Sequence, residues 1–326
     1  MKIFVTGSSG FIGFHLSKKL LEKGHSVHGF DSMNKYYDIK IKKARLKILK
    51  KYNKFSFTKN KLENKKTLSK SILKFKPTTI IHLAAQAGVR YSIENPKAYM
   101  DSNITGTYNI IELSKKINIK HLLIASSSSV YGANKKLPFT ENDKTETQLS
   151  IYAATKKSTE SIAHSYSNIW KIPITMLRFF TVYGPWGRPD MAYFKFTESI
   201  LQNKPIDVFN YGNLFRDFTY IDDIVDGINE IHGVIPEKAG KDGNQFASEI
   251  YNIGNGNPIN LLDFIKELEL NLGKECKKNM VEMQPGDVFK TYADISKLND
   301  LVGYKPKVAF KEGIKLFIDW YKSYYI

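Results

Sequence analysis

The chain has 326 residues, of which 42% are hydrophobic and 25% charged, a composition typical of a globular protein with one large or two modest domains. Its single cysteine, Cys276, excludes an internal disulfide framework, and no apolar run approaches the roughly 20 residues that span a bilayer, so we expect a soluble cytoplasmic protein. The net charge of +17 is uneven, because residues 40–76 hold 15 Lys or Arg side chains and one acid, Glu63.

The predicted elements alternate between short apolar runs and helical patterns through the first half of the chain. Strands are expected at "KIFVTG", "SVHGFD", "KFSF", "TTIIHLAA", "HLLIASSSS" and "PITMLRFF". The helices between them are expected over residues 11–23, 36–52, 67–75, 96–117 and 151–170. Strands that alternate with helices of this length predict an α/β fold with a doubly wound parallel sheet of the Rossmann type.

The rhythm changes after Gly184, where short strands and helices predict a smaller, mixed α/β region. We therefore divide the chain into residues 1–184, which form the Rossmann domain, and residues 185–326, which mainly close over the ligand end of the sheet. Some segments of the second part are expected to return to the sheet.

The lysine-rich segment is interpreted as a solvated helix. Five apolar residues lie among its lysines, at Ile41, Ala44, Leu46, Ile48 and Leu49, roughly the mix of an amphipathic surface helix. A basic stripe can mark a nucleic-acid footprint, but no aromatic residues interleave with these charges as a stacking platform requires. We expect neither a nucleic-acid partner nor a membrane partner.

Polar clusters follow the predicted strands where each strand ends. They are Gly7–Gly13, Asp31, Ala84–Arg90, Ser126–Ser129 and Thr181. Because ligands of doubly wound sheets bind beyond the carboxyl ends of the strands, we expect these clusters to line one site.

The first cluster has the pattern of a dinucleotide loop. Glycines at 7, 10 and 13 follow the first strand and open the first helix, so a pyrophosphate can approach the backbone amides at the helix N-terminus. Asp31 ends the second strand 18 residues after Gly13, where its carboxylate can accept both ribose hydroxyls and would repel a 2′-phosphate. The pattern predicts NAD and disfavours NADP.

Tyr152 and Lys156 are four residues apart on a predicted helix and therefore share a face. A free tyrosine has a pKa of about 10 and is a poor base at neutral pH. A neighbouring ammonium group favours the phenolate, which makes the tyrosine useful for proton transfer. Alone, a Tyr and a Lys one turn apart are common on surfaces; together with the glycine loop, Asp31 and the serines they indicate an oxidoreductase-type site.

This combination resembles the extended short-chain dehydrogenase/reductase family over nearly the whole chain, and within that family the UDP-glucuronate 4-epimerases. The resemblance lies in "DSMNKYYD" (31–38), "LAAQAGVRYS" (83–92), "SSSSVYG" (126–132), "YAATK" (152–156), "RFFTVYGPWGRPDMA" (178–192), "RDFTYIDDIVDGI" (216–228) and "MQPGDVFKTYAD" (283–294). The run 178–192 discriminates most, because 4-epimerases of neutral sugars usually carry Asn where Thr181 stands.

The resemblance implies NAD-dependent epimerisation of UDP-glucuronate to UDP-galacturonate through a transient 4-keto sugar. Tyr152 would take the proton of the sugar 4-hydroxyl, Ser127 would hydrogen-bond the same oxygen, and Lys156 would tune Tyr152. Because the cofactor is regenerated in each cycle, it is expected to stay bound. No metal is expected.

The family motifs also imply which residues contact each ligand. The expected NAD contacts are Gly7, Gly10, Phe11, Ile12, Gly13, Asp31, Ser32, Lys35, Leu62, Leu83, Ala84, Ala85, Ala87, Asn103, Ser126, Tyr152, Lys156 and Phe179. The expected contacts of the UDP-sugar are Arg90, Ser127, Ser128, Ser129, Tyr152, Thr181, Arg188, Val208, Arg216 and Asp287.

Ser128 and Ser129 bear on the outcome of the reaction. A 4-keto sugar acid is a β-keto acid that readily loses CO₂, and related decarboxylases and dehydratases carry acidic side chains in this segment. Hydroxyls at 128, 129 and 181 can donate to the substrate carboxylate without adding a like charge or an acid for elimination. They disfavour the decarboxylase and dehydratase alternatives.

Two departures from the family pattern stand out. Lys61 replaces an aspartate near the adenine, and a lysine cannot accept a hydrogen bond from the adenine amino group. Lys290 stands where small residues are usual. The alternatives left open are a 4-epimerase of another UDP-sugar, a UDP-glucuronate decarboxylase and a catalytically inactive binding protein. By resemblance we expect a homodimer whose product serves polysaccharide biosynthesis.

Overall fold

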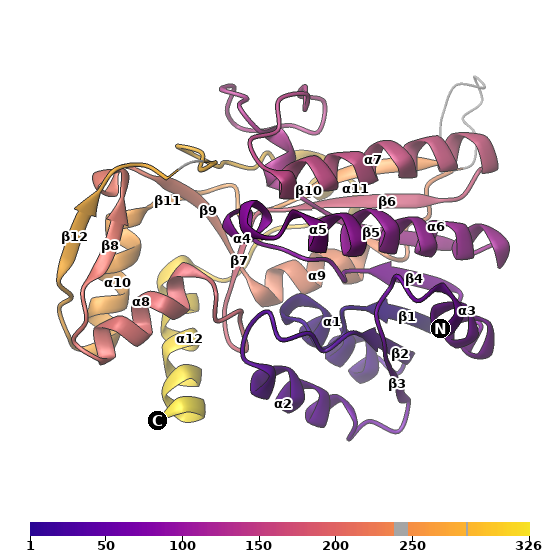
Figure 1. The fold of residues 1–326 in the computed structure, drawn as a ribbon, viewed down its shortest axis with the longest axis horizontal. Coiled ribbons are helices and arrows are strands. Elements are labelled where there is room, and N and C mark those ends of the chain that lie inside the picture. The colour runs from indigo at the N-terminus through magenta and orange to yellow at the C-terminus, as the bar shows by residue number, and fades with distance from the viewer. Residues whose placement is uncertain (238–246, 285) are drawn as a thin grey trace.

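A computed structural model describes residues 1–237, 247–284 and 286–326, and its centre is a seven-stranded parallel sheet (Figure 1). Across the sheet the strands are β3 (Phe55–Lys59), β2 (Ser26–Asp31), β1 (Lys2–Thr6), β4 (Thr79–His82), β5 (His121–Ser127), β6 (Ile174–Phe179) and β10 (Ser248–Ile253). The chain starts at β1, runs outward to β3 and then returns to β4 on the other side. The predicted doubly wound Rossmann-type sheet is confirmed, and its switch point lies between β1 and β4.

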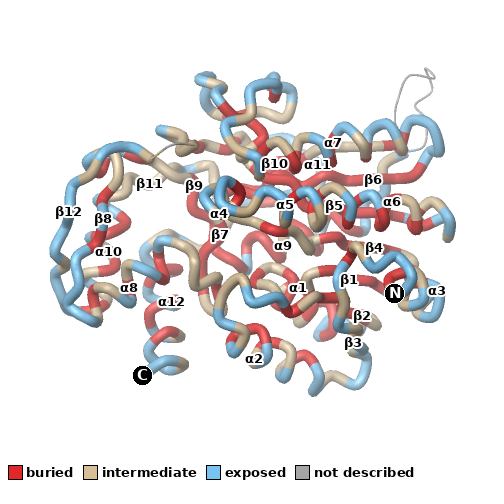
Figure 2. The backbone as a smooth tube through the Cα atoms, in the orientation of Figure 1, coloured by how far each residue is buried: buried red, intermediate tan, exposed pale blue. Residues whose placement is uncertain are grey.

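Helices cover both faces of the sheet. One face packs against α1 (Phe11–Glu22), α2 (Ile39–Leu49), α9 (Ile221–Ile231) and α11 (Ser296–Val302), and the other against α3 (Lys65–Phe75), α6 (Gly106–Lys116) and α7 (Ile151–Trp170). Alternate residues of β1 therefore enter different cores: Ile3 and Val5 join the first and Phe4 joins the second. Figure 2 shows the central strands as the most deeply buried part of the chain.

Several helices begin where short polar side chains accept hydrogen bonds from free backbone amides. Asp38 accepts from the amide of Lys40 at the start of α2, and Asn64 caps α3 in the same way. The serine before α7, Ser150, accepts from the amide of Ala153 and so fixes the start of the helix that carries Tyr152.

The helix predicted over 96–117 is interrupted. It consists of α5 (Pro96–Tyr99), a π-helical segment η1 (Met100–Thr105) and α6, and it follows a short helix α4 (Val89–Glu94). The wider π turn shifts the following face of the helix, and such turns are frequent beside functional sites. No periodicity in the sequence distinguishes this segment from an ordinary α-helix.

Most of the second part of the chain, together with residues 181–183 of the first part, builds a smaller lobe on the left of Figure 1. It contains a three-stranded sheet of β7 (Thr181–Tyr183), β9 (Phe215–Tyr220) and β11 (Pro258–Asn260), and a strand pair of β8 (Ile206–Phe209) and β12 (Lys278–Val281). Three helices pack there: α8 (Ala192–Leu201), α10 (Leu261–Leu272) and α12 (Phe310–Tyr325). Two short 3₁₀ turns, η2 (Ser128–Tyr131) and η3 (Asn210–Gly212), complete the described elements, while β10, α9 and α11 return to the main sheet.

The prediction of a solvated lysine-rich helix is wrong for two residues of α2. Lys42 is 6% exposed and Arg45 is fully buried. The Arg45 guanidinium donates hydrogen bonds to the carbonyl oxygen of Ser9 at 3.0 Å and to that of Gly187 at 2.8 Å. Because those carbonyls belong to segments far apart in the sequence, only the tertiary fold gives this side chain its partners.

Among the described residues, no helix is both long enough and apolar enough to cross a membrane.

Candidate active site

A large cavity of about 1610 Å³ opens at the carboxyl ends of the sheet strands, between the sheet and the smaller lobe. Of the ligand contacts expected from the sequence, all but Asn103 and Val208 line this cavity. The polar clusters of the sequence thus converge on one site, as the topology predicts.

Two expected contacts lie behind the cavity wall. The Asn103 side chain, on η1, is 1% exposed; its oxygen accepts from the amide of Gln86 at 2.8 Å and its nitrogen donates to Thr155 Oγ1 at 3.0 Å. It therefore supports the wall between β4 and α7. The Val208 side chain is fully buried in the core of β8, while its neighbours Asp207 and Phe209 line the cavity.

The glycine loop leaves room for a ligand at the start of α1. Gly7 has a φ of +73°, and a Cβ on Gly13 would lie 2.1 Å from the carbonyl oxygen of Gly7. No side chain caps α1 at Gly10, so the first amides of the helix are free to bind an anion. These residues fit the pyrophosphate of a dinucleotide.

Asp31 lies at the end of β2 and is held by the backbone. Its two carboxylate oxygens accept from the amides of Ser9 at 3.0 Å and Met33 at 2.8 Å. The carboxylate faces the cavity beside the glycine loop, and its remaining lone pairs fit the ribose hydroxyls of the same dinucleotide.

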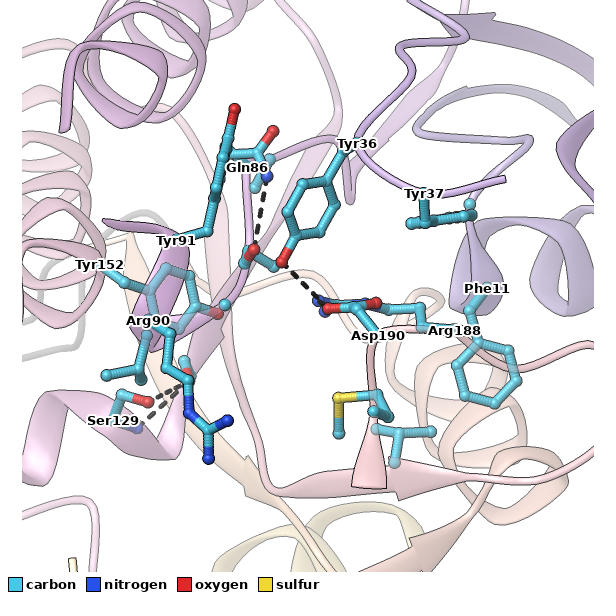
Figure 3. Close-up of a pocket in the computed structure, with 18 of the residues that line it drawn as sticks. Phe11, Tyr36, Tyr37, Gln86, Arg90, Tyr91, Ser129, Tyr152, Arg188 and Asp190 are labelled. Atoms are coloured by element: carbon cyan, nitrogen blue, oxygen red, sulfur yellow. Dashed lines mark hydrogen bonds and ion pairs between the residues drawn. The ribbon is translucent and has the colours of Figure 1, made fainter. Parts of the chain in front are cut away.

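Ser127, Ser129 and Tyr152 line the same cavity, and Figure 3 shows Ser129 and Tyr152 on one side of it. Ser127 Oγ lies 3.2 Å from Ser129 Oγ and accepts from the Ser129 amide at 3.2 Å. Burial raises the pKa of Tyr152, and a hydrogen bond with Ser127 and the charge of Arg188 lower it. The Tyr152 phenol, with the Ser127 hydroxyl and the Arg188 guanidinium acting on it, can therefore transfer a proton.

Lys156 lies one turn after Tyr152 on α7 and is 6% exposed. Its ammonium group donates to the carbonyl oxygen of Ala125 at 2.7 Å. Burial lowers the pKa of Lys156 to about 8, against the opposing effect of the Glu160 carboxylate. Burial and the Glu160 carboxylate therefore act on this ammonium group in opposite directions.

The hydroxyls of Ser128 and Thr181 face the cavity without competing partners. Both residues line it, and within the described residues no hydrogen bond to a protein group occupies either side chain. Free hydroxyl donors at this wall suit a carboxylate ligand.

An arginine–aspartate pair, not predicted from the sequence, holds Arg188 in place. Its guanidinium donates to both carboxylate oxygens of Asp190, at 3.1 and 2.5 Å, and Tyr36 donates to the same carboxylate at 3.1 Å. Burial lowers the pKa of Arg188, but Asp190 outweighs this effect and leaves it above its ordinary value. Figure 3 shows the three side chains directed toward one another. In the sequence, the feature that could have indicated this pair is Asp190, an acidic residue two positions after the expected ligand contact Arg188.

The far end of the cavity lies in the smaller lobe. Arg216 Nη2 is 3.7 Å from Asp287 Oδ1, and the Arg90 guanidinium lies 5.0 Å from the centre of the Phe209 ring. Lys61 lines the opposite end and is exposed. Lys290 lies outside the cavity lining, with its ammonium group 5.4 Å from the centre of the Phe215 ring. Of the motif 283–294, residue 285 lies outside the described residues.

Comparisons with known proteins agree with this geometry. The model of the family described as GDP-mannose 4,6 dehydratase matches residues 4–317. The chain is 52% identical to Protein CapI of Staphylococcus aureus, over 100% of this chain and 99% of that one. It is 47% identical to a probable UDP-glucuronate 4-epimerase of Rhizobium meliloti, over 100% and 98% of the two chains. A crystal structure of UDP-glucuronic acid 4-epimerase from Bacillus cereus, in complex with UDP-glucuronic acid and NAD, superposes with a TM-score of 0.91 at 35% identity over 100% of both chains.

Proposed function

The chain belongs to the GDP-mannose 4,6 dehydratase family and groups within it with the UDP-glucuronate 4-epimerases, and on this premise we propose that it interconverts UDP-glucuronate and UDP-galacturonate with NAD as cofactor. The observation that carries the proposal is the meeting of Ser127, Tyr152 and Lys156 in a cavity that also contains the dinucleotide loop.

Bound NAD supplies a reversible acceptor for the hydrogen on the sugar C4. The chain's own residues handle the proton. Tyr152 removes it from the 4-hydroxyl and returns it at the end of the cycle, while Ser127 donates a hydrogen bond to the same oxygen. Burial disfavours the Tyr152 phenolate, and the hydrogen bond with Ser127 and the charge of Arg188 favour it. We expect the Lys156 ammonium, one turn away on α7, to favour it as well.

The carboxylate of the substrate is recognised by hydroxyls. Ser128 and Thr181 line the cavity beside Tyr152 and have free donors. A hydroxyl stabilises the carboxylate without offering a strong acid or base, which protects the β-keto acid from elimination or decarboxylation during its lifetime. This arrangement favours epimerisation over UDP-glucuronate decarboxylation.

The remaining cations hold the nucleotide half of the substrate. Arg188 acts on Tyr152 at the reacting end of the cavity, whereas Arg90, beside Phe209, and the Arg216–Asp287 pair lie at the far end. A planar guanidinium suits a diphosphate, and the Asp287 carboxylate suits the hydroxyls of the uridine ribose.

A homodimer formed through α6 and α7 is part of the proposal. Tyr108 on α6 is 41% exposed, and Ile169 and Trp170 on α7 are 62% and 45% exposed. Large apolar side chains gathered on two adjacent helices support a protein interface. Light scattering during gel filtration would measure the mass, and a monomer at all concentrations would contradict the interface.

We place the reaction in the cytoplasm, where a protein with a single cysteine stays reduced. Its product would supply uronic acid units for polysaccharide biosynthesis.

Incubation of the purified protein with UDP-glucuronate, without added NAD, tests the proposal by proton NMR. Formation of UDP-galacturonate supports both the reaction and retention of the cofactor. Formation of a UDP-pentose and CO₂ would contradict the role given to the hydroxyls. If only UDP-glucose or an N-acetylated UDP-sugar reacts, the fold and mechanism hold but the substrate is wrong.

A further inference from the structure

A buried ion pair lies directly behind the proposed catalytic residues, between α7 and β6. The Arg178 Nε donates to Glu160 Oε1 at 2.9 Å, and its Nη2 donates to Oε2 at 2.8 Å. Both side chains are 2% exposed, and neither lines the cavity. Because burying two charges is costly even when they pair, such a pair is weak evidence for stability and calls for another explanation.

The carboxylate of this pair reaches the end of β5. Ser126 Oγ donates to Glu160 Oε1 at 2.6 Å, and Ser126 immediately precedes Ser127. On α7, Glu160 follows Lys156 by one turn, and Lys156 donates to the carbonyl oxygen of Ala125. The end of β5 is therefore tied to α7 at two successive residues.

The guanidinium extends the same network to η2, which carries Ser128 and Ser129. Arg178 Nη1 donates to the Tyr131 hydroxyl at 3.1 Å, and that hydroxyl donates to Asn252 Oδ1 at 2.6 Å. The segment 126–131 of the proposed sugar site is thus anchored near both ends, at Ser126 through Glu160 and at Tyr131 through Arg178.

We propose that the Glu160–Arg178 pair positions the catalytic residues by fixing the ends of β5 and η2 against α7. Both are positioning residues, since neither touches the cavity. The inference deepens the proposed function and depends on it for its kinetic part only.

The pair also acts on the charge of Lys156. The Glu160 carboxylate raises the pKa of Lys156 against the larger lowering by burial. Without that carboxylate the pKa of Lys156 falls further below 8, so its ammonium group is lost at a lower pH. Since the charged form supports the Tyr152 phenolate, activity should then disappear earlier as the pH rises.

Other charged and titratable groups surround the pair and must be unchanged in the test. They are Lys157 on α7, Tyr131 on η2 and Glu141 in the loop after η2, whereas His82 on β4 faces Lys156. Lys157 Nζ lies 3.7 Å from Glu160 Oε2. Among the described residues, Glu160 is the acid that acts on Lys156.

Two variants of the holoenzyme test the proposal. Glu160→Gln removes one charge, and the combination of Glu160→Leu with Arg178→Met removes both, which avoids an unpaired buried charge and so favours a folded protein. We expect kcat to fall about 10- to 100-fold in each, as for a misplacement of roughly 1 Å, with KM for UDP-glucuronate changed less than about twofold. In Glu160→Gln the alkaline limb of the kcat profile should move to lower pH.

A readout without the sugar separates this inference from the proposed function. NMR titration of lysine side chains, with the Lys156 signal assigned by its loss in Lys156→Arg, should show a lower pKa for Lys156 in Glu160→Gln. The matched control is Glu249→Gln, which removes an exposed carboxylate paired with Lys297 at 2.7 Å and should change nothing.

The outcomes are distinct. If both variants fold, keep kcat within about twofold and leave the Lys156 titration unchanged, the pair is only a structural contact and the proposal is overturned. If the unaltered protein does not convert UDP-glucuronate, the proposed function fails, and the lysine titration alone decides whether Glu160 acts on Lys156.

Discussion

The proposed cofactor half and the proposed sugar half of the cavity are built in opposite ways. The cofactor half uses backbone amides and one carboxylate from a continuous β–α–β unit, residues 2–31. The sugar half uses side chains from separate segments, among them Arg90, Thr181, Arg188 and Arg216. The geometry of the first half follows from the spacing of residues within one β–α–β unit. The geometry of the second half depends on the tertiary packing of separate segments.

This difference has a physical consequence. Glycines in the loop have no side chain and so allow the backbone to approach the ligand closely. Any added atom in the loop should therefore weaken ligand binding. Charged side chains bind by their orientation, which their neighbours set, as Asp190 and Tyr36 do for Arg188. The sugar half should therefore respond to changes in residues that never touch the substrate.

The two halves are linked by one buried side chain. Arg45 donates to the carbonyl of Ser9 in the glycine loop and to that of Gly187 beside Arg188. The loop that carries Arg188 is thereby tied to the dinucleotide loop, although Arg45 and Gly187 lie 142 positions apart in the sequence.

The largest expected effect on activity comes from Tyr152, which is expected to contact both the cofactor and the sugar. Tyr152→Phe should lower kcat by about 10²–10⁴-fold, because it removes only the group that transfers the proton. NAD content and UDP affinity, measured by absorbance and calorimetry, should stay unchanged. The control is Tyr166→Phe, which removes a hydroxyl from the same helix outside the cavity lining. That hydroxyl donates a hydrogen bond to Glu112 Oε1 at 2.8 Å. A near-normal rate in Tyr152→Phe would refute the assigned base.

A second variant tests the cofactor half alone. In Gly13→Ala the new Cβ would lie 2.1 Å from the Gly7 carbonyl oxygen, and such overpacking costs about 1–3 kcal/mol. NAD affinity should fall about 10- to 100-fold, measured by calorimetry on protein stripped of cofactor. Gly233→Ala, where the nearest atom is 3.9 Å from the new Cβ, is the control. Equal NAD binding in both variants would mean that the loop does not hold the dinucleotide.

A third variant tests whether packing controls the sugar half. Asp190→Asn keeps the size of the side chain but removes the charge that orients Arg188, a charged hydrogen bond worth about 1.5–3 kcal/mol. We expect kcat/KM for UDP-glucuronate to fall roughly 10- to 100-fold while NAD content is unchanged. Asp207→Asn, in the same cavity but exposed, serves as the control. Tighter substrate binding in Asp190→Asn would show that Asp190 competes with the substrate and does not orient the arginine.

The same contrast explains what the sequence could predict. The parallel sheet, the glycine loop, Asp31 and the approach of Tyr152 to Lys156 follow from spacing and from the shared edge of the sheet. The π-helical segment at Met100–Thr105 could not be predicted, because a π turn has no distinct hydrophobic period.

Buried charges were missed for a related reason. Arg45 and Glu160 look like solvated helix residues in the sequence, and their partners come from other elements. Val208 shows the reverse case: its neighbours reach the cavity, but strand alternation turns its own side chain into the core, so the expected substrate contact would have to use its backbone. Segment positions followed from the sequence, whereas the direction of each side chain depended on the fold.

The smallest expected effect tests whether the cofactor half tolerates a local change of contact. Lys61 lines the cavity and is exposed, and the family resemblance places it near the adenine, so Lys61→Asp should fold normally and offer an acceptor to the adenine amino group. One added hydrogen bond of about 0.5–1.5 kcal/mol predicts a gain of about 2- to 10-fold in NAD affinity. Lys66→Asp makes the same change of charge at an exposed position of α3, outside the cavity lining. It separates a direct contact with the adenine from the electrostatic field of the lysine-rich segment. An equal gain of NAD affinity in both variants would assign the effect to the electrostatic field of the lysine-rich segment. A gain in Lys61→Asp alone would show that a single side chain at the edge of the proposed cofactor half also contributes to NAD binding.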